Sequence, residues 1–202
     1  VGYYQTVNKT TPVAGDVKYV DRNGDGVVDD NDRDIIGNPN PDFTYGFQTK
    51  VSWKSLSLSA SFNGVQGRDI LNVGNRYNNT PGTKSNNVTR KAFQNMWTDE
   101  NPSNLYPKST FVVQNMVMDR YVEDGSYLRC SDITLSYVLP AKWTNKIGIK
   151  NTSVYASVKN AFVITDYSGY DPEVNSFAFD GLRPGVDMNS YPTPRSFVFG
   201  LN

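Results

Sequence analysis

Residues 43–62 read FTYGFQTKVSWKSLSLSASF, and this stretch decides the fold of the chain. Apolar and aromatic side chains alternate with polar ones from residue 43 to 53, and the alternation resumes at Leu56 after Lys54-Ser55. A period of two is the pattern of a β-strand with one apolar face, so two such runs joined by a minimal turn predict a β-hairpin. Each run has about ten residues, which is typical of a tilted strand that crosses a bilayer and exceeds the roughly five or six residues usual in soluble sheets.

The same alternation returns in three later segments, which are 127–139, 153–164 and 196–202. The connections between the alternating segments are short, long, short and long in turn. The short connections are Lys54-Ser55 and 140–150, and the long ones are 64–126 and 165–194. Short turns at one end of the strands and long loops at the other are typical of outer-membrane barrels. Alternation alone also fits a soluble antiparallel sandwich with one solvated face.

Composition places the chain among all-β proteins and excludes several functions. With 20 basic and 20 acidic residues, nothing indicates a nucleic-acid partner. The chain has no His, which removes the commonest general base, and its single Cys, Cys130, is expected to be a small packing residue. The adjacent acids Asp99/Glu100 and Glu123/Asp124 are candidate carboxylate pairs, but adjacent acids on loops are usually solvated. We therefore expect no enzymatic activity.

No segment reaches the ~18–20 consecutive apolar residues of a transmembrane helix. The chain also carries no secretory signal sequence and does not begin with Met. We therefore expect it to begin part-way through a longer protein.

A second signal lies in residues 21–32, which read DRNGDGVVDDND. The spacing matches the ligand positions of the twelve-residue calcium loop, with Gly26 at the position of the sharp turn. The ion needs six or more oxygen ligands at about 2.3–2.6 Å, so the chain must wrap around it. The predicted ligands are Asp21, Asn23, Asp25, Val27 through its carbonyl, Asp29 and Asp32. The last of these is shorter than the usual bidentate Glu, and the alternative is a solvated turn without metal.

Four aromatic residues with Asn and Asp neighbours lie in the two long connections: Trp97, Tyr106, Tyr167 and Tyr170. Sugars and peptides are commonly held by aromatic rings together with amide and carboxylate groups. We take these residues as candidate substrate contacts. For each of them, packing between loops or against a partner protein is the alternative.

Five runs resemble, in the same order, the C-terminal portion of SusC-like, TonB-dependent outer-membrane transporters, the nutrient importers of Bacteroidetes. The runs are GDVKY at 15–19 leading into the loop at 21–29, IGNPNPDFTYG at 36–46, RYVEDGSYLR at 120–129, NAF at 160–162 with GYDPE at 169–173, and YPTPRSF at 191–197. Together they cover nearly the whole chain, and several motifs in one order are more specific than any single motif.

The resemblance implies that the chain forms the C-terminal antiparallel strands of a 22-stranded transmembrane β-barrel in the outer membrane. It also implies import of oligosaccharides or peptides, delivery by a SusD-like surface lipoprotein, and energy from TonB, which would act through the N-terminal part that this chain lacks. A barrel needs at least about eight strands to close. We therefore expect the remaining strands of the same barrel, and outer-membrane lipid, to surround this chain.

The resemblance also divides the chain. Residues 1–42 would be an extracellular loop segment with the calcium-type loop, and residues 43–202 would be barrel strands with their extracellular loops. The turns at Lys54-Ser55 and 140–150 would then be periplasmic. The alternative function is a soluble calcium-dependent carbohydrate-binding or docking β-module. A docking module would need a second calcium loop and flanking helices, and the sequence shows neither.

Overall fold

The computed structural model describes residues 13–80, 87–109, 117–145, 148, 152–173 and 175–202. The chain forms two compact units. The sheet unit comprises Asn38–Leu71 and Glu123–Asn202, and the loop unit comprises Val1–Gly37 and Asn72–Val122. The units interleave along the sequence because packing rather than chain order defines them. The expected division after residue 42 follows chain order and stays a prediction.

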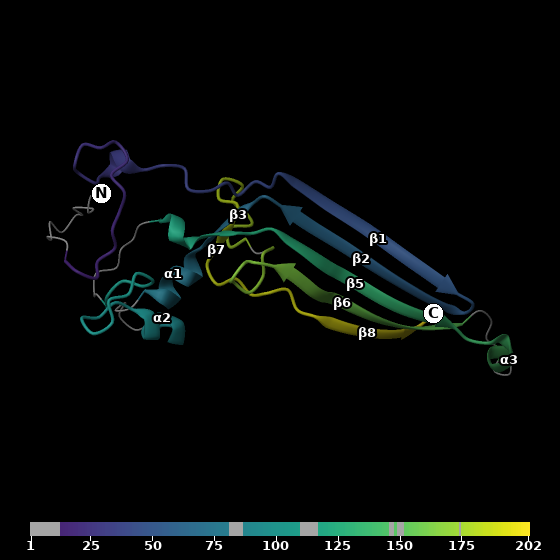
Figure 1. Cartoon of the computed structure of the whole chain (residues 1–202). Coiled ribbons are helices and arrows are strands. Elements are labelled where there is room, and N and C mark those ends of the chain that lie inside the picture. Colours follow the sequence, from purple (N-terminus) through teal and green to yellow (C-terminus); the bar gives the residue numbers. More distant parts are fainter. Residues whose placement is uncertain (1–12, 81–86, 110–116, 146–147, 149–151, 174) are drawn as a thin grey trace. The chain divides into compact units, whose positions relative to one another are not determined.

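The sheet unit is built on five antiparallel strands (Figure 1). They are β1 (Phe43–Trp53), β2 (Leu56–Gln66), β5 (Tyr127–Val138), β6 (Ser153–Thr165) and β8 (Ser196–Leu201), paired in the order β1-β2-β5-β6-β8. The five predicted strands are therefore confirmed. β1 begins and ends where its sequence pattern does, whereas β2 continues beyond the quoted alternation as far as Gln66.

The turn between β1 and β2 consists of Lys54 and Ser55, with Trp53 paired to Leu56 across it. Two-residue hairpin turns favour positive φ because this conformation matches the right-handed twist of the strands. Lys54 has a φ of 54°, which is uncommon for a residue other than glycine. Its ammonium group lies 4.7 Å from the centroid of the Trp53 ring, and this cation–π contact stabilises the turn.

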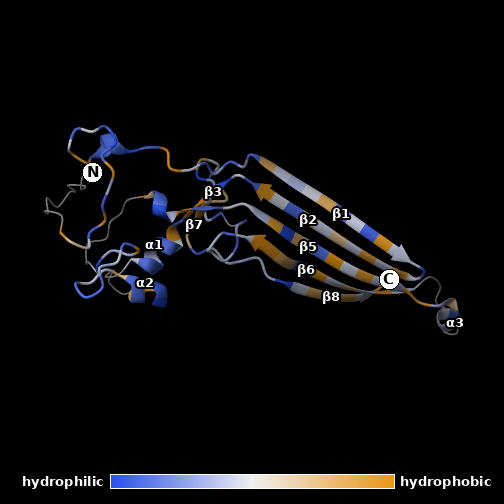
Figure 2. Cartoon of the chain, viewed as in Figure 1, coloured by the Kyte–Doolittle hydropathy of each residue, from blue (hydrophilic) through white to orange (hydrophobic). Residues whose placement is uncertain are grey.

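The strand register gathers apolar side chains of the five strands on one face of the sheet, here called the apolar face. Phe47 pairs with Phe62, and their rings stack with centroids 4.6 Å apart. Phe62 makes an edge contact with Phe162, at 6.3 Å, over Cys130, which pairs with both. Cys130 is fully buried, as expected of a packing residue. Figure 2 shows polar and apolar residues alternating along the strands.

β5 carries one more residue than its neighbour β2 at a β-bulge. Ser61 pairs with Asp132 while the next residue, Phe62, pairs with Cys130, so Ser131 is the extra residue. A register shift at the same residues continues into the pairing with β6. A bulge of this kind bends the strand and increases its local twist.

A small second sheet pairs β3 (Asp69–Asn72) with β4 (Val122–Asp124) and β7 (Val186–Asp187). Ile70 is fully buried, and a Cβ on Gly125 would lie 2.6 Å from its side chain. Only glycine allows this close approach. One well-buried part of the sheet unit therefore lies around Ile70, just beyond the end of β2.

The described part of the loop unit contains four short helical segments: η1 (Asp30–Asp32), α1 (Val73–Asn79), α2 (Arg90–Asn95) and η2 (Asp119–Tyr121). The side chains of Asn72 and Thr89 accept hydrogen bonds from backbone N–H groups and so cap α1 and α2. A further helix, α3 (Ala141–Thr144), lies in the short connection after β5. Among the described residues, no helix is long and apolar enough to cross a membrane.

Candidate functional site

The second face of the large sheet, here called the polar face, carries small polar and charged side chains. Ser52 and Ser57 face each other across β1 and β2, with their hydroxyl oxygens 2.9 Å apart. Other members of this face on β1, β2, β5 and β6 are Gln48, Lys50, Ser59, Ser61, Asn63, Arg129, Asp132, Thr134, Ser136, Ser157 and Lys159. Hydroxyl groups dominate, so the face offers hydrogen bonds to water and to polar solutes.

Asp132 and Lys159 form a charged pair in the middle of the polar face. Lys159 Nζ lies 2.6 Å from Asp132 Oδ2. The same carboxylate accepts hydrogen bonds from Thr134 Oγ1 and Ser157 Oγ, both at 2.8 Å. The two charges therefore neutralise each other, and hydroxyl groups of β5 and β6 hold the carboxylate in place.

Arg129 is the most buried charged residue of the polar face. Its guanidinium group pairs with two carboxylates of the segment after β6, at 2.5 Å from Asp171 and 2.8 Å from Glu173. The side chains of Arg129 and Asp171 are 6% and 4% exposed. A guanidinium suits two carboxylates because its five N–H donors are fixed in one plane. We call Arg129, Asp171 and Glu173 the arginine anchor.

Further hydrogen bonds satisfy the carboxylates of the arginine anchor. Tyr127 donates its hydroxyl to Glu173 at 2.6 Å, and Asn63 Nδ2 donates to the same group at 3.2 Å. The backbone N–H groups of Glu173 and Thr193 each donate to Asp171 at 3.0 Å. Burial alone would raise the pKa of Asp171, but these N–H groups and the guanidinium outweigh it, so its pKa lies below the usual value. The carboxylate therefore stays charged and paired at neutral pH.

A second buried acid, Asp187, forms a hydrogen bond within segment 165–194. Asp187 is 2% exposed and accepts a hydrogen bond from the Tyr167 hydroxyl at 2.6 Å. Burial, followed by the hydrogen bond to this carboxylate, raises the pKa of Tyr167, so its hydroxyl remains a donor. Ser168 donates both its backbone N–H and its hydroxyl to Glu123, each at 2.9 Å. The segment is thus held by several polar contacts besides the arginine anchor.

The predicted calcium loop closes through hydrogen bonds to its own backbone. Asp21 accepts from the N–H group of Gly26 at 2.9 Å, and Gly26 has the positive φ, 86°, that the spacing predicts. Asp32 accepts from the N–H groups of Arg22 at 2.7 Å and Asp29 at 2.8 Å. These bonds join the beginning of the loop to its end.

The other predicted ligands of this loop also bond locally. Asn23 Nδ2 donates to Asp25, and the Asp25 N–H donates back to Asn23, each at 2.9 Å. The N–H of Val27 donates to Asp25 at 2.8 Å, and Asp29 caps η1 through the N–H of Asn31 at 2.7 Å. Within the described part of the chain, no three His, Cys, Asp or Glu residues are grouped so as to hold a metal ion. The loop is a hydrogen-bonded acidic turn, and calcium binding stays a prediction.

Two of the four predicted substrate contacts lie together in the loop unit. The Trp97 N–H donates to the Tyr106 carbonyl at 3.0 Å, and both residues line an open cleft of about 1160 Å³. Gly15 lies against the Trp97 ring, where a Cβ would come within 2.5 Å of a ring atom. The Arg120 guanidinium lies 5.9 Å from the centroid of the Tyr106 ring. The cleft therefore combines aromatic rings with a cation.

The other two predicted contacts belong to the sheet unit and differ in exposure. Tyr167 is 5% exposed and its hydroxyl is bonded to Asp187, so it packs inside its own segment. Tyr170 is 73% exposed and free to meet another molecule. Contact with substrate stays a prediction for these residues and for the pair in the loop unit.

Sequence reasoning missed the arginine anchor as a site, although its residues lie in two of the motif runs quoted above. Arg129 ends the run at 120–129, and its two acids belong to the run at 169–173. Arg129 and Asp171 are 42 positions apart. Pairing over such a distance depends on the strand register and on the path of the loop, which no local pattern contains.

Comparison with known proteins adds the family. No family model matches the chain. TonB-dependent receptor P26 of Formosa agariphila is 34% identical over 198 residues, which are 94% of this chain and 20% of that receptor. TonB-dependent receptor SusC of Bacteroides thetaiotaomicron is 34% identical over 191 residues, which are 91% of this chain and 17% of SusC. The chain belongs to the SusC-like TonB-dependent receptors.

Solved structures agree with this assignment of the SusC-like chain. The RagAB peptide importer in its "closed-closed" state matches 91% of this chain and 20% of the importer chain, with a TM-score of 0.72 and 27% identity. Its "open-open" state matches 83% of this chain with a TM-score of 0.68 and 28% identity. The SusC-like chain therefore spans about a fifth of the length of the relatives it matches. These relatives are receptors and importers rather than enzymes, as the sequence predicts.

Proposed function

We propose that this chain is the C-terminal part of an outer-membrane transporter that imports oligosaccharides or peptides together with a SusD-like surface lipoprotein. In this proposal its strands belong to a 22-stranded barrel, and TonB supplies energy through the N-terminal part of the receptor. Membership of the SusC-like receptors supports the proposal. The observation that carries it is the pair of chemically opposite faces on one long-stranded sheet.

The apolar face of the large sheet is exposed to an extent unusual for a surface in water. Trp53 is 68% exposed, Phe197 65% and Phe199 77%. Soluble monomers rarely expose continuous apolar patches larger than a few hundred Å². Lipid hydrocarbon is the environment that suits such a face, and the polar face then lines a hydrated interior.

β1 and β8 are the edge strands of the large sheet. In hydrocarbon each unpaired backbone N–H or C=O group costs several kcal/mol, so a membrane sheet cannot keep open edges. The remaining strands of the same receptor pair with both edges in this proposal and close the barrel. β1 pairs with β2 over its whole length, from Phe43 to Trp53, so its other edge offers a strand of eleven residues for pairing.

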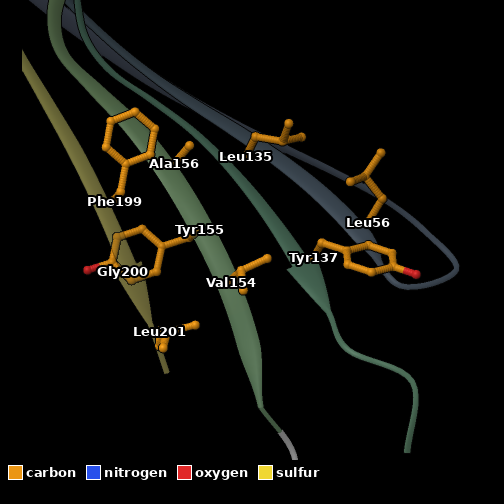
Figure 3. Close-up of a pocket in the computed structure, with 9 residues that line it drawn as sticks. All are labelled: Leu56, Leu135, Tyr137, Val154, Tyr155, Ala156, Phe199, Gly200 and Leu201. Atoms are coloured by element: carbon orange, nitrogen blue, oxygen red, sulfur yellow. The ribbon is translucent and has the colours of Figure 1, made fainter. Parts of the chain in front are cut away.

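A shallow hollow of about 550 Å³ spans β2, β5, β6 and β8 (Figure 3). Ala156 leaves space beside Leu135 and Phe199 because its side chain is small. Leu56 and Val154 add further apolar lining. Acyl chains of membrane lipid fill this hollow in the proposal, so it requires no separate ligand.

Loop length gives the orientation in the membrane. The short connections at Lys54-Ser55 and 140–150 face the periplasm, and the long connections at 64–126 and 165–194 face the outside. The cleft that contains Trp97 and Tyr106 then lies on the extracellular side, where substrate and the lipoprotein arrive. This placement supports a role for both residues in contacting one of them.

Calcium, in this proposal, is a structural clamp for the 21–32 loop. All six predicted donors are oxygen atoms, which suit a hard cation. The carboxylates of Asp21 and Asp32 each have lone pairs beyond those used by the backbone N–H groups. Binding would draw these carboxylates together with Asp25 and Asp29 around one ion.

Partition between membrane and water tests the proposed function. The full-length receptor is expected in the detergent-soluble membrane fraction, and its migration on a gel should change after heating, as it does for closed barrels. A folded monomer that needs no detergent would contradict the proposal and favour the calcium-dependent carbohydrate-binding or docking module. Co-purification from the native membrane, followed by mass spectrometry, would identify the lipoprotein and any bound glycan or peptide.

A further inference from the structure

We propose that Arg129 is a positioning residue that fixes segment 165–194 on the polar face as a stationary ledge. The ledge narrows the hydrated side of the sheet and keeps its place while substrate passes. That this side is a transport passage rests on the proposed function. The fixed position of the ledge does not, because it follows from contacts within the sheet unit.

The ledge lies on the polar face because it contacts polar-face residues of two strands. Glu173 is bonded to Asn63 of β2 and to Tyr127 and Arg129 of β5. Asn63 and Arg129 are direct partners in the register of these strands. Asp171 brings a second carboxylate to the same guanidinium group. The segment therefore crosses the β2–β5 pair on the side opposite to the exposed aromatic rings.

Both ends of the ledge are attached to the sheet as well. At its start, Thr165 Oγ1 donates to the Ser126 carbonyl at 2.8 Å. At its end, Asn160 Nδ2 donates to the Pro194 carbonyl at 3.0 Å. Segments that open and close have few buried contacts and many solvated ones. This segment is instead attached at both ends and, between them, through the arginine anchor and through the pairing of β7 with β3.

Loss of the guanidinium would release the part of the ledge around Asp171 and Glu173, while β7 of the same segment stays paired with β3. Asp171 would lose its cation while 4% exposed, and a buried carboxylate without a partner is strongly unfavourable. This part of the segment must then lift from the polar face so that water reaches the two acids. The attachments at Thr165 and Pro194 do not involve Arg129, so the large sheet keeps its register.

The test measures one distance across the ledge in the full-length receptor. Spin labels are placed at Lys50→Cys, on β1, and at Tyr191→Cys, which replaces a side chain that is 87% exposed, and are read by double electron–electron resonance. Cys130 is fully buried and stays unlabelled. We expect a single narrow distribution that a soluble TonB fragment and the lipoprotein leave unchanged. Arg129→Gln should broaden it roughly twofold or more, and Arg129→Lys, which keeps the charge without the planar fork, should fall between.

Arg183→Gln is the matched control, because Arg183 lies on the same segment and its side chain is 63% exposed beside Asp180. It should leave the distribution unchanged. Two separate distances in the parent receptor, or a narrow distribution in Arg129→Gln, would overturn the ledge. If Arg129→Gln does not assemble, Asp171→Asn gives the same readout. Absence of the receptor from the membrane fraction would contradict the proposed function alone.

Discussion

Asp171 and Asp32 show how differently one residue type works in two parts of this chain. The pKa of each carboxyl lies below its usual value. For Asp32 the cause is the backbone N–H groups of Asp29 and Arg22, within its own loop. For Asp171 burial opposes the shift, and backbone N–H groups with the distant Arg129 reverse it. A solvated acid therefore shapes a turn, whereas a buried acid holds distant segments together and is costly to leave unpaired.

Removing the guanidinium of Arg129 should have the largest effect, and it should lower the free energy of unfolding. Arg129→Met leaves the two acids of the anchor without a cation, and breaking a buried ion pair from one side costs roughly 3–5 kcal/mol. Urea-induced unfolding of the full-length receptor in lipid vesicles measures the change in the free energy of unfolding. Arg183→Met, on an exposed pair, is the control. A decrease in the free energy of unfolding of less than about 1 kcal/mol would contradict the prediction, because the buried anchor would then contribute no more than a solvated ion pair.

Acid should have the second-largest effect, by weakening the attachment of the ledge to the sheet. Because the folded-state pKa of Asp171 is lowered, its stabilising contribution is present above the unfolded value of about 3.9 and is lost as pH falls through the folded value. Cleavage of segment 165–194 by an acid-active protease should therefore rise only below about pH 4. Asp171→Asn should be cleaved readily at every pH at which the protease is active. A wild-type profile that stays flat down to about pH 2 would contradict the role given to this carboxylate.

Chelation should have a smaller and local effect. EDTA removes the ion, and Asp25→Ala removes one of its oxygen ligands. Either change should increase protease cleavage within residues 21–32. Segment 165–194 contains none of the predicted ligands and should keep its resistance, which makes it the internal control. Unchanged cleavage in both regions would end the calcium assignment. The loop would then be an acidic turn held by hydrogen bonds alone.

The smallest effect is expected from the exposed pair on the ledge itself. Arg183 and Asp180 lie 3.2 Å apart with side chains 63% and 41% exposed. Pairs of this kind contribute about 0–1 kcal/mol. Arg183→Gln should change the midpoint of thermal unfolding by no more than about 2 °C. A shift as large as that of Arg129→Met would show that exposure does not separate the two arginines.

The sequence predicts the two regions unequally for physical reasons. β1 is predictable to its last residue because the period of two runs without interruption from Phe43 to Trp53. The acidic turn is predictable because its partners lie within twelve residues, and the positive φ of Gly26 follows from the spacing. Whether an ion binds there depends on how closely the carboxylates converge, which spacing does not specify.

The arginine anchor could not be predicted from the sequence, for two reasons. Its partners lie 42 positions apart, so no local period connects them. Counting back along β5 by twos from Leu135 and Ile133 also assigns Arg129 to the apolar side. The register instead pairs Arg129 with Asn63, on the polar face. An interruption of the strand, which composition does not reveal, overrides the alternation.

That interruption is Ser131, and in the proposed barrel it determines whether a side chain of β5 faces lipid or water. If Ser131 were drawn into the regular ladder, every side chain from Tyr127 to Cys130 would change sides. The guanidinium of Arg129 would then face acyl chains, and the thiol of Cys130 would face water. Because Ser131 lies outside the ladder, the alternation of side chains between the two faces shifts by one residue at this point of the strand. In the proposed barrel, the number of residues in β5 therefore keeps the charge of Arg129 out of the hydrocarbon.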